Sequence, residues 1–175
     1  MERMTDHNCL ACRVEKFATE KEPFHFTDSG LSNVYLVGIK YFVCECGRVV
    51  AEIPAVKQLM RLIARDLVTS TADLRGAEIK FLRKRLGKRG SDFSQYLGVT
   101  PETLSRVENG KQAASRQIQK LARLAYCLFS EDPALVECAK SILQSIFEET
   151  TRHNKKEKIV LEMDINQEWR ELKAA

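Results

Sequence analysis

The chain lacks the sequence features by which most membrane proteins and enzymes are recognised. Its longest apolar runs are about half of what a membrane-spanning helix needs. It has only three histidines, widely separated, and we find no glycine-rich phosphate loop, no paired carboxylates at a useful spacing and no nucleophile with a neighbouring base. We therefore expect neither a membrane protein nor an enzyme.

A signal-peptide core is also missing from the first residues, Met1-Glu2-Arg3-Met4, so we expect a cytoplasmic protein. The hydrophobic content of 44% and the charged content of 30% are typical of a soluble globular protein. The 175 residues suffice for one ordinary domain or two small ones. In a protein of this kind, six cysteines indicate metal binding or buried thiols before disulfides.

Positive charge is concentrated in the middle of the chain. Residues 75–123 hold 12 Lys or Arg against 4 Asp or Glu, which is a net charge of +8. Residues 1–74 have a net charge of −1, and residues 124–175 have −3. Such a segment is either a solvated basic face or the electrostatic footprint of a nucleic-acid-binding site.

The same segment has the pattern of a helix-turn-helix. Residues 77–111 consist of a short helix, a turn, a second helix, the helix-breaking segment Leu97-Gly98-Val99-Thr100-Pro101 and a third helix that ends at Glu108-Asn109-Gly110. Thr100 is a good N-cap, Pro101 suits the first helical position, and Gly110 suits a left-handed cap. A short, sharply bounded helix carried on two others is the unit that enters the DNA major groove.

Apolar periodicity predicts which side chains of this segment face the core. The first helix turns Ile79, Leu82 and Leu86 inward and Lys80, Arg83, Lys84 and Arg85 outward, and Lys88-Arg89-Gly90-Ser91 is the turn. Phe93, Leu97 and Val99 bury the second helix. Leu104 and Val107 bury the third, which leaves Glu102, Thr103, Ser105, Arg106 and Asn109 free on its outer faces. A fourth helix, capped by Ser115, has a stripe of Ile118, Leu121, Ala122, Ala125 and Leu128.

The segment resembles the lambda-repressor/Cro (XRE) class of helix-turn-helix domain. The matching residues are Ile79-x-x-Leu82-Arg83, Leu97-Gly98-Val99-Thr100, Thr103-Leu104-Ser105-Arg106 and Glu108-Asn109-Gly110-Lys111. The resemblance implies DNA contacts by Arg89, Ser91, Thr100, Pro101, Glu102, Thr103, Ser105, Arg106, Asn109 and Lys111. The class commonly has Ser-Gln where this chain has Arg89-Gly90, so the phosphate contact of that glutamine is lost or passes to Arg89 or Ser91.

The implied contacts divide into base-reading and phosphate-binding groups. The resemblance places Glu102, Thr103 and Arg106 against base edges, with Pro101 at the groove entrance. Arg106 can bind guanine through O6 and N7, and Glu102 can accept from a cytosine amino group. Asn109, Lys111 and Arg89 hold phosphates in this scheme, and Glu108 holds the helix end. The alternatives are an Arg106 that is only solvated and a Glu102 that serves the helix dipole.

Two close pairs of cysteines mark the N-terminal segment. Cys9-Leu10-Ala11-Cys12 is a C-x-x-C pair and Cys44-Glu45-Cys46-Gly47 a C-x-C pair, with 31 residues between them. Four converging thiolates form a closed zinc site of the structural type, so we expect structural zinc on Cys9, Cys12, Cys44 and Cys46. The alternatives are two reduced pairs, a redox C-x-x-C, a catalytic zinc, or a site in which His7 replaces one thiolate.

Strand-forming residues lie between and after these cysteines. The runs at 23–26, 34–43 and 49–53, with a turn at Asp28-Ser29-Gly30, predict a small antiparallel sheet pinned by the metal. Pro54 then opens a helix, and a polar linker follows at residues 69–73. The apolar face of this helix consists of Val56, Leu59, Met60, Ile63, Leu67 and Val68.

The C-terminal residues predict a further helix and a tail. Asp132-Pro133 starts the helix, and part of its stripe packs on the helix-turn-helix while the rest is a candidate dimer seam. The stripe consists of Leu135, Val136, Ala139, Ile142, Leu143, Ile146 and Phe147. Cys127 and Cys138 are expected to be buried thiols. In the tail we expect a strand at 159–163 and a short helix at 166–174.

The expected fold class is therefore α+β. A small zinc-bound antiparallel β domain occupies residues 1–73, an all-α helix-turn-helix domain residues 74–130, and a helical C-terminal extension residues 131–175. This layout resembles the MqsA/YgiT-type antitoxins and related zinc-finger/helix-turn-helix regulators, in which the zinc domain binds a toxin and the C-terminal dimer represses the operon. The C-x-C pair, where C-x-x-C is usual, and the long tail are departures from that family.

Together these patterns predict a sequence-specific DNA-binding transcriptional repressor. It acts as a homodimer on a palindromic operator of double-stranded DNA, regulates its own transcription and, by the resemblance, is the antitoxin of a type II toxin–antitoxin pair. The alternative is a protein-interaction module whose zinc domain binds and neutralises a partner protein such as a toxin, with DNA binding secondary.

Overall fold

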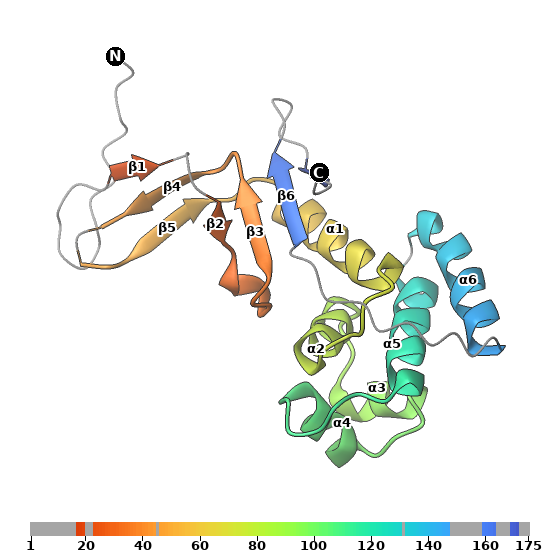
Figure 1. The fold of residues 1–175 in the computed structure, drawn as a ribbon. Coiled ribbons are helices and arrows are strands. Elements are labelled where there is room, and N and C mark those ends of the chain that lie inside the picture. Colours follow the sequence, from red (N-terminus) through yellow and green to blue (C-terminus); the bar gives the residue numbers. More distant parts are fainter. Residues whose placement is uncertain are drawn as a thin grey trace.

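A computed structural model of the chain describes residues 17–19, 23–44, 46–130, 132–147, 159–163 and 169–171. The strands gather at one end of the molecule and most helices at the other. Helix α1 (Val56–Thr69) runs from the sheets into the helical part (Figure 1). The predicted order, a small antiparallel β region followed by a helical region, is confirmed.

The strands form two sheets, where the sequence predicted a single one. The first sheet has the order β1-β4-β5 and is antiparallel; it consists of β1 (Phe17–Thr19), β4 (Lys40–Val43) and β5 (Val49–Glu52). The second has the order β2-β3-β6-β7 and consists of β2 (Phe24–His25), β3 (Val34–Val37), β6 (Ile159–Met163) and β7 (Trp169–Glu171). A short 3-10 helix, η1 (Thr27–Ser29), lies between β2 and β3.

Gly38 explains why the run predicted at residues 34–43 is divided between the sheets. Its φ of 76° lies in the left-handed region, which glycine adopts readily and other residues only at a cost. The chain therefore turns after β3, which pairs with β2 in the second sheet, and continues as β4, which pairs with β1 and β5 in the first. One apolar run thus supplies a strand to each sheet.

The C-terminal segment returns to the N-terminal strands. The strand predicted at 159–163 is confirmed as β6, and it pairs parallel with β3 in the register Val34↔Ile159 to Val37↔Glu162 (Figure 1). The helix predicted at 166–174 is wrong over Trp169–Glu171, which is β7 and pairs antiparallel with β6. Backbone hydrogen bonds to β6 stabilise this segment as a strand, whereas so short a helix has little stability of its own.

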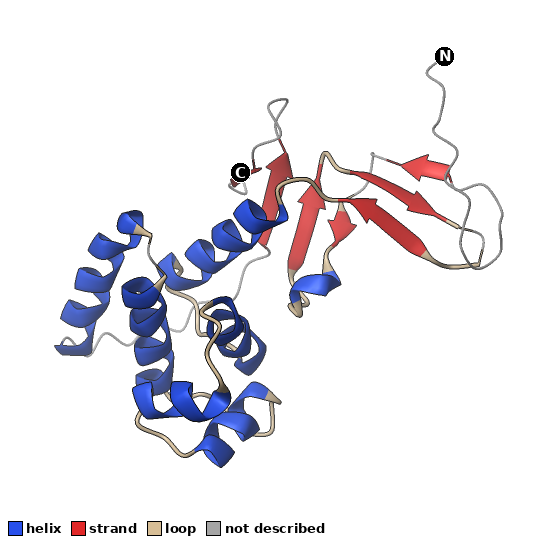
Figure 2. Cartoon of the chain, turned by 180° about the vertical axis from the view of Figure 1, so that it is seen from behind, coloured by secondary structure: helices blue, strands red, loops and turns tan. Residues whose placement is uncertain are grey.

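The remaining helices pack together, with α5 in contact with most of them. They are α2 (Gly76–Arg85), α3 (Gly90–Tyr96), α4 (Pro101–Glu108), α5 (Arg116–Phe129) and α6 (Val136–Phe147), the last preceded by the 3-10 helix η2 (Pro133–Leu135). Helix α5 contacts α1, α2, α3 and α6. Helix α4 lies at the end of the molecule away from the sheets (Figure 2). No helix in the described part of the chain is both long and apolar enough for a membrane span.

One apolar core extends from β3 through α1 into the helical part. Its members with no exposed surface are Val34, Leu36, Leu59, Ile63, Ala64, Ile79, Leu82, Phe93, Val107 and Ala122. Polar contacts join α1 and the residues after it to α5. Arg123 donates from Nε to the carbonyl of Leu67 at 3.2 Å and from its guanidinium to the carbonyl of Ala72. The linker predicted at 69–73 is therefore held against α5.

Some residues predicted on apolar stripes lie at the surface. Leu128 is 61% exposed, Val136 52%, and Val56 and Leu143 43% each. For Leu128 the reason is that α5 is covered by helices on several sides, so Gln119, Tyr126 and Cys127 are buried beside the predicted stripe. Cys127 is buried as predicted, and Cys138 is half-buried.

Candidate nucleic-acid interface

Local signals set both ends of α4. The Oγ1 of Thr100 accepts a hydrogen bond from the N–H of Thr103 at 3.2 Å, and Pro101 occupies the first helical position. Gly98 before the helix has a φ of 63° and Gly110 after it a φ of 72°. The predicted boundaries of this helix are therefore confirmed.

The inner face of α4 packs against α2 and α3. Leu104 and Val107 are buried, as predicted. The approach to α2 depends on Gly76, because a Cβ at this position would lie 1.8 Å from the carbonyl oxygen of Val107. Only glycine permits backbones to approach so closely, so Gly76 determines how near α4 lies to the start of α2.

An ion pair holds the other end of α4. Arg83 of α2 binds the carboxylate of Glu108 with two hydrogen bonds, Nε to Oε1 and Nη2 to Oε2, each 2.7 Å long. Its Nη1 donates to the carbonyl of Lys88 at 2.9 Å. Arg83 thus joins α2, the turn before α3 and the end of α4, and Glu108 holds the helix end as predicted.

The prediction that Arg83 points outward is wrong. Its side chain is only 14% exposed, and that of Glu108 is 7% exposed. A carboxylate this buried keeps its charge only if it is paired and hydrogen-bonded, and the planar guanidinium supplies two matched donors. The hydrogen bond to Glu108 raises the pKa of Arg83 further above its usual range.

The outer face of α4 presents Glu102, Ser105 and Arg106 to solvent, as predicted. The pKa of Glu102 is lowered, first by a hydrogen bond from its own backbone N–H, then by the Thr100 hydroxyl and the positive charge of Arg106. Glu102 is therefore a charged acceptor, while the guanidinium of Arg106 is a fixed cluster of donors. These are the two chemistries that distinguish base edges in the major groove.

Two other residues that were predicted on this face also form contacts within the protein. Thr103 is half-buried, and its hydroxyl lies 3.1 Å from that of Thr100. Asn109 donates from Nδ2 to the hydroxyl of Ser105 at 3.4 Å and accepts from the Nζ of Lys80 at 3.5 Å. Both side chains keep further donors and acceptors beside these internal contacts.

The predicted phosphate contacts before α4 lie at the start of α3, not in the preceding turn. Arg89 is the N-cap position and Gly90 the first helical residue, although no side chain caps this helix. Arg89 pairs with Asp92 at 3.2 Å, and the Ser91 hydroxyl donates to the same carboxylate. The hydrogen bond from Arg89 is the main cause that lowers the pKa of Asp92. A phosphate at this position therefore competes with Asp92 for Arg89.

Sequence reasoning missed three residues that position or extend this surface: Gly76, Lys80 and Arg83. Glycine in the first turn of a helix is less stabilising than alanine. The presence of Gly76 there could therefore have indicated close packing at this position. No local signal separates Arg83 from its exposed neighbours Lys84 and Arg85. Its partner lies 25 positions further along the chain.

The C-x-C pair lies in the hairpin between β4 and β5. The N–H of Cys44 donates to the carbonyl of Arg48 and the N–H of Gly47 to the carbonyl of Cys44, both at 2.8 Å. This tight turn, in which Gly47 has a φ of 82°, brings the Sγ atoms of Cys44 and Cys46 to 3.3 Å. Two thiolates at about 2.3 Å from one zinc ion lie about 3.8 Å apart across a tetrahedron, which is wider than the separation of this pair.

The other two predicted zinc ligands, Cys9 and Cys12, lie outside the described residues. Within the ranges that the structure covers, no three His, Cys, Asp or Glu side chains gather as a metal site would require. The zinc site therefore remains a prediction.

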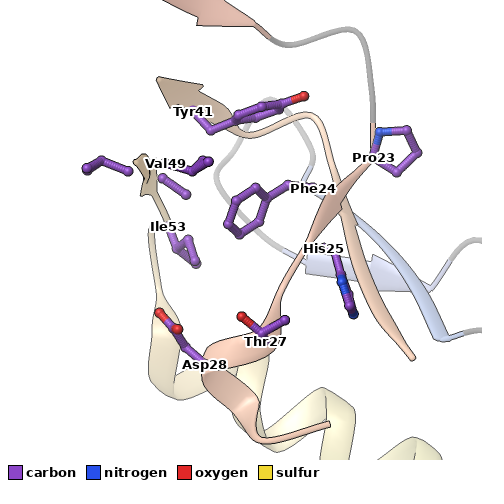
Figure 3. Close-up of a pocket in the computed structure, with 10 residues that line it drawn as sticks. Pro23, Phe24, His25, Thr27, Asp28, Tyr41, Val49 and Ile53 are labelled. Atoms are coloured by element: carbon purple, nitrogen blue, oxygen red, sulfur yellow. The ribbon is translucent and has the colours of Figure 1, made fainter. Parts of the chain in front are cut away.

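A cavity of about 560 Å³ lies between β2 and the β4–β5 hairpin (Figure 3). Phe24 and Tyr41 form an aromatic pair on one side, with ring centroids 5.4 Å apart. Val49 and Ile53 lie opposite, and Thr27 and Asp28 occupy the end nearest α1 (Figure 3). The sequence analysis did not predict this cavity, because it forms between strands of different sheets.

A helix-turn-helix family of the XRE type matches residues 79–124, from α2 to the middle of α5. The chain therefore contains an XRE-type helix-turn-helix domain, the domain of DNA-binding regulators, and this agrees with the class of domain predicted from its motifs. Comparison with curated proteins gave no match, and neither did comparison with solved structures.

Proposed function

We propose that the protein is a sequence-specific transcriptional repressor that binds a palindromic operator as a homodimer and regulates its own transcription. The observation that carries the proposal is the outer face of α4 in an XRE-type domain, with Glu102, Ser105 and Arg106 exposed on a helix whose ends are fixed. A helix held in one position presents the same donors and acceptors to every DNA sequence. This fixed arrangement is the condition for binding one DNA sequence more tightly than the others.

Helix α6 supports pairing of two copies. Val136 and Leu143 are 52% and 43% exposed, and their spacing of seven residues places them on one side of the helix. Packing of this side against a second copy removes apolar surface from water and produces the two-fold symmetry that a palindrome requires. The double substitution Val136→Glu and Leu143→Glu is expected to yield a monomer by analytical ultracentrifugation. If the variant remains a dimer, the interface between the two copies does not involve these residues.

The experiment that tests DNA binding uses the full-length protein, DNA from its own promoter and unrelated DNA at two salt concentrations. We expect Arg106→Ala to lose roughly 1–3 kcal/mol on the promoter site and to flatten the preference at one base pair. Lys111→Ala is the matched control, because loss of a phosphate contact weakens binding to all DNA sequences. It also lowers by about one the slope of the logarithm of the binding constant against the logarithm of the salt concentration. Equal affinity of the unchanged protein for promoter and unrelated DNA contradicts the proposal.

Zinc in this proposal is structural and is held by Cys9, Cys12, Cys44 and Cys46. The turn that brings the Cys44 and Cys46 sulfurs close together supports it, because a closed site requires two ligands from each pair. We expect one zinc per chain by elemental analysis of freshly purified protein, and loss of that zinc in Cys44→Ser. Cys127→Ser is the control and should retain the metal. Absence of zinc in the unchanged protein removes this part of the proposal.

A second candidate function, which includes the antitoxin hypothesis, is the binding of a partner protein through the β region. It is favoured by exposed apolar surface on the β4–β5 hairpin, where Val43, Val49 and Val50 are 39–48% exposed beside the cavity. The test is co-purification with the product of the adjacent gene. Val50→Glu should abolish it and Val136→Glu should leave it unchanged. Equal recovery with both variants contradicts binding at this hairpin.

A further inference from the structure

Helix α1 carries a row of basic side chains that the DNA-binding proposal does not use. Lys57, Arg61 and Arg65 recur every four residues, so they lie along one face of the helix, about 6 Å apart. All three are exposed. Within residues 23–44, 46–130 and 132–144, none forms an ion pair with them.

This arrangement opposes the stability of the helix. Like charges at a spacing of four residues repel one another, and each neighbouring pair in the row has this spacing. Lys57 also lies in the first turn, where the helix dipole favours acidic residues, and that turn contains none. Where a sequence keeps unfavourable local charges that its neighbouring described side chains do not neutralise, a binding role is the expected reason.

The row is separate from the proposed DNA interface. Figures 1 and 2 both show α1 beside the sheets and α4 at the opposite end of the helical part. A duplex held against the outer face of α4 therefore lies at the far end of the helical part from α1. The row is also bordered by apolar surface, since Val56, next to Lys57, is 43% exposed. Arginine beside exposed apolar side chains is typical of protein interfaces, whereas nucleic-acid interfaces are more polar.

We propose that Lys57, Arg61 and Arg65 of α1 form a second interaction surface that binds the acidic surface of a partner protein. Carboxylates on the partner relieve the repulsion within the row, and each guanidinium offers the paired donors that match a carboxylate. The surface differs in place from the β4–β5 hairpin and does not depend on DNA binding.

The test measures the full-length protein against two fluorescent probes, poly-L-glutamate and promoter DNA, by anisotropy. One variant combines Lys57→Gln, Arg61→Gln and Arg65→Gln. The matched control combines Arg89→Gln, Lys111→Gln and Arg116→Gln, which removes the same charge from exposed cations near α3, α4 and α5. Far-UV circular dichroism confirms that both variants fold.

We expect the α1 variant to lose about tenfold in affinity for poly-L-glutamate, as the loss of three exposed ion pairs implies. Its affinity for promoter DNA should stay within about twofold of the unchanged protein, since a factor of two is a small free-energy change. The control should show the opposite pattern. Equal loss of poly-L-glutamate binding in both variants overturns the proposal, because only net charge then matters. Loss of DNA binding in the α1 variant also overturns it and assigns the row to nucleic acid. If the unchanged protein does not prefer promoter DNA, that result contradicts the repressor proposal and not the proposal for the α1 surface.

Discussion

Arg83 and Glu108, on different helices, are joined by two hydrogen bonds of 2.7 Å and are both largely shielded from water. This pair, together with the bond from Arg83 to the carbonyl of Lys88, connects the end of the proposed reading helix to the rest of the domain. The orientation of α4 therefore depends on a contact that is largely shielded from solvent.

We expect Arg83→Ala to destabilise the protein by about 3–5 kcal/mol, because it leaves the carboxylate of Glu108 buried without a partner. The measurement is the urea midpoint of unfolding. Arg89→Ala is the matched control, since it removes an ion pair with Asp92 in which Arg89 is 85% exposed, and the midpoint should hardly change. Similar midpoints for the two variants contradict a structural role for the Arg83–Glu108 pair.

Gly76 and Gly90 each lie at the first position of a helix and permit a second matched comparison. Gly76→Ala forces a Cβ into the carbonyl of Val107, so we expect a loss of about 3 kcal/mol or more. A Cβ at Gly90 meets no atom within 4 Å, and Gly90→Ala should gain about 0.4–1 kcal/mol by restricting the unfolded chain. Thermal unfolding measures both, and equal effects contradict the close approach of α2 and α4.

Stability should fall at alkaline pH because of Cys127. Burial, reinforced by its neighbour Cys138, raises the pKa of the Cys127 thiol from 9.0 to about 12. Above pH 9.0 the unfolded chain releases this proton while the folded protein keeps it, so the unfolded state is favoured as pH rises.

The measurement is the free energy of unfolding of the unchanged protein and of Cys127→Ala at pH 9 and pH 10. The unchanged protein should lose about 1 kcal/mol more than the variant over this interval. Tyr126, whose pKa is also raised by burial, titrates in both proteins and cancels in the comparison. Parallel pH dependences contradict the prediction.

Removal of β6 and β7 should loosen the N-terminal strands. A chain that ends at residue 158 leaves β3 paired only with the two-residue β2, although Val34 and Leu36 are fully buried. A two-stranded ribbon is marginally stable, so the amides of β3 should exchange with deuterium faster, while those of α4 stay protected. A chain that ends at residue 171 retains both strands and is the control. Unchanged exchange in the shorter chain means that β6 does not stabilise β3.

How much of this structure was predictable depends on how far apart the interacting residues lie. The ends of α4 were predicted correctly because Thr100, Pro101 and Gly110 each act on a backbone only a few residues away. The division of the strands at Gly38 was missed, although its cause is local, because an apolar run does not show in which sheet its two halves pair.

The amino-acid sequence by itself therefore determined the helix-turn-helix pattern, the caps of α4 and the exposure of Glu102 and Arg106. Caps, turns and periodicity depend on neighbouring residues, so they can be read without the fold. The tertiary structure alone decided that Arg83 turns inward to Glu108, that Gly76 admits α4, and that β6 pairs with β3. These contacts join residues far apart in the chain, and burial with hydrogen-bond geometry selects them only once the chain has folded.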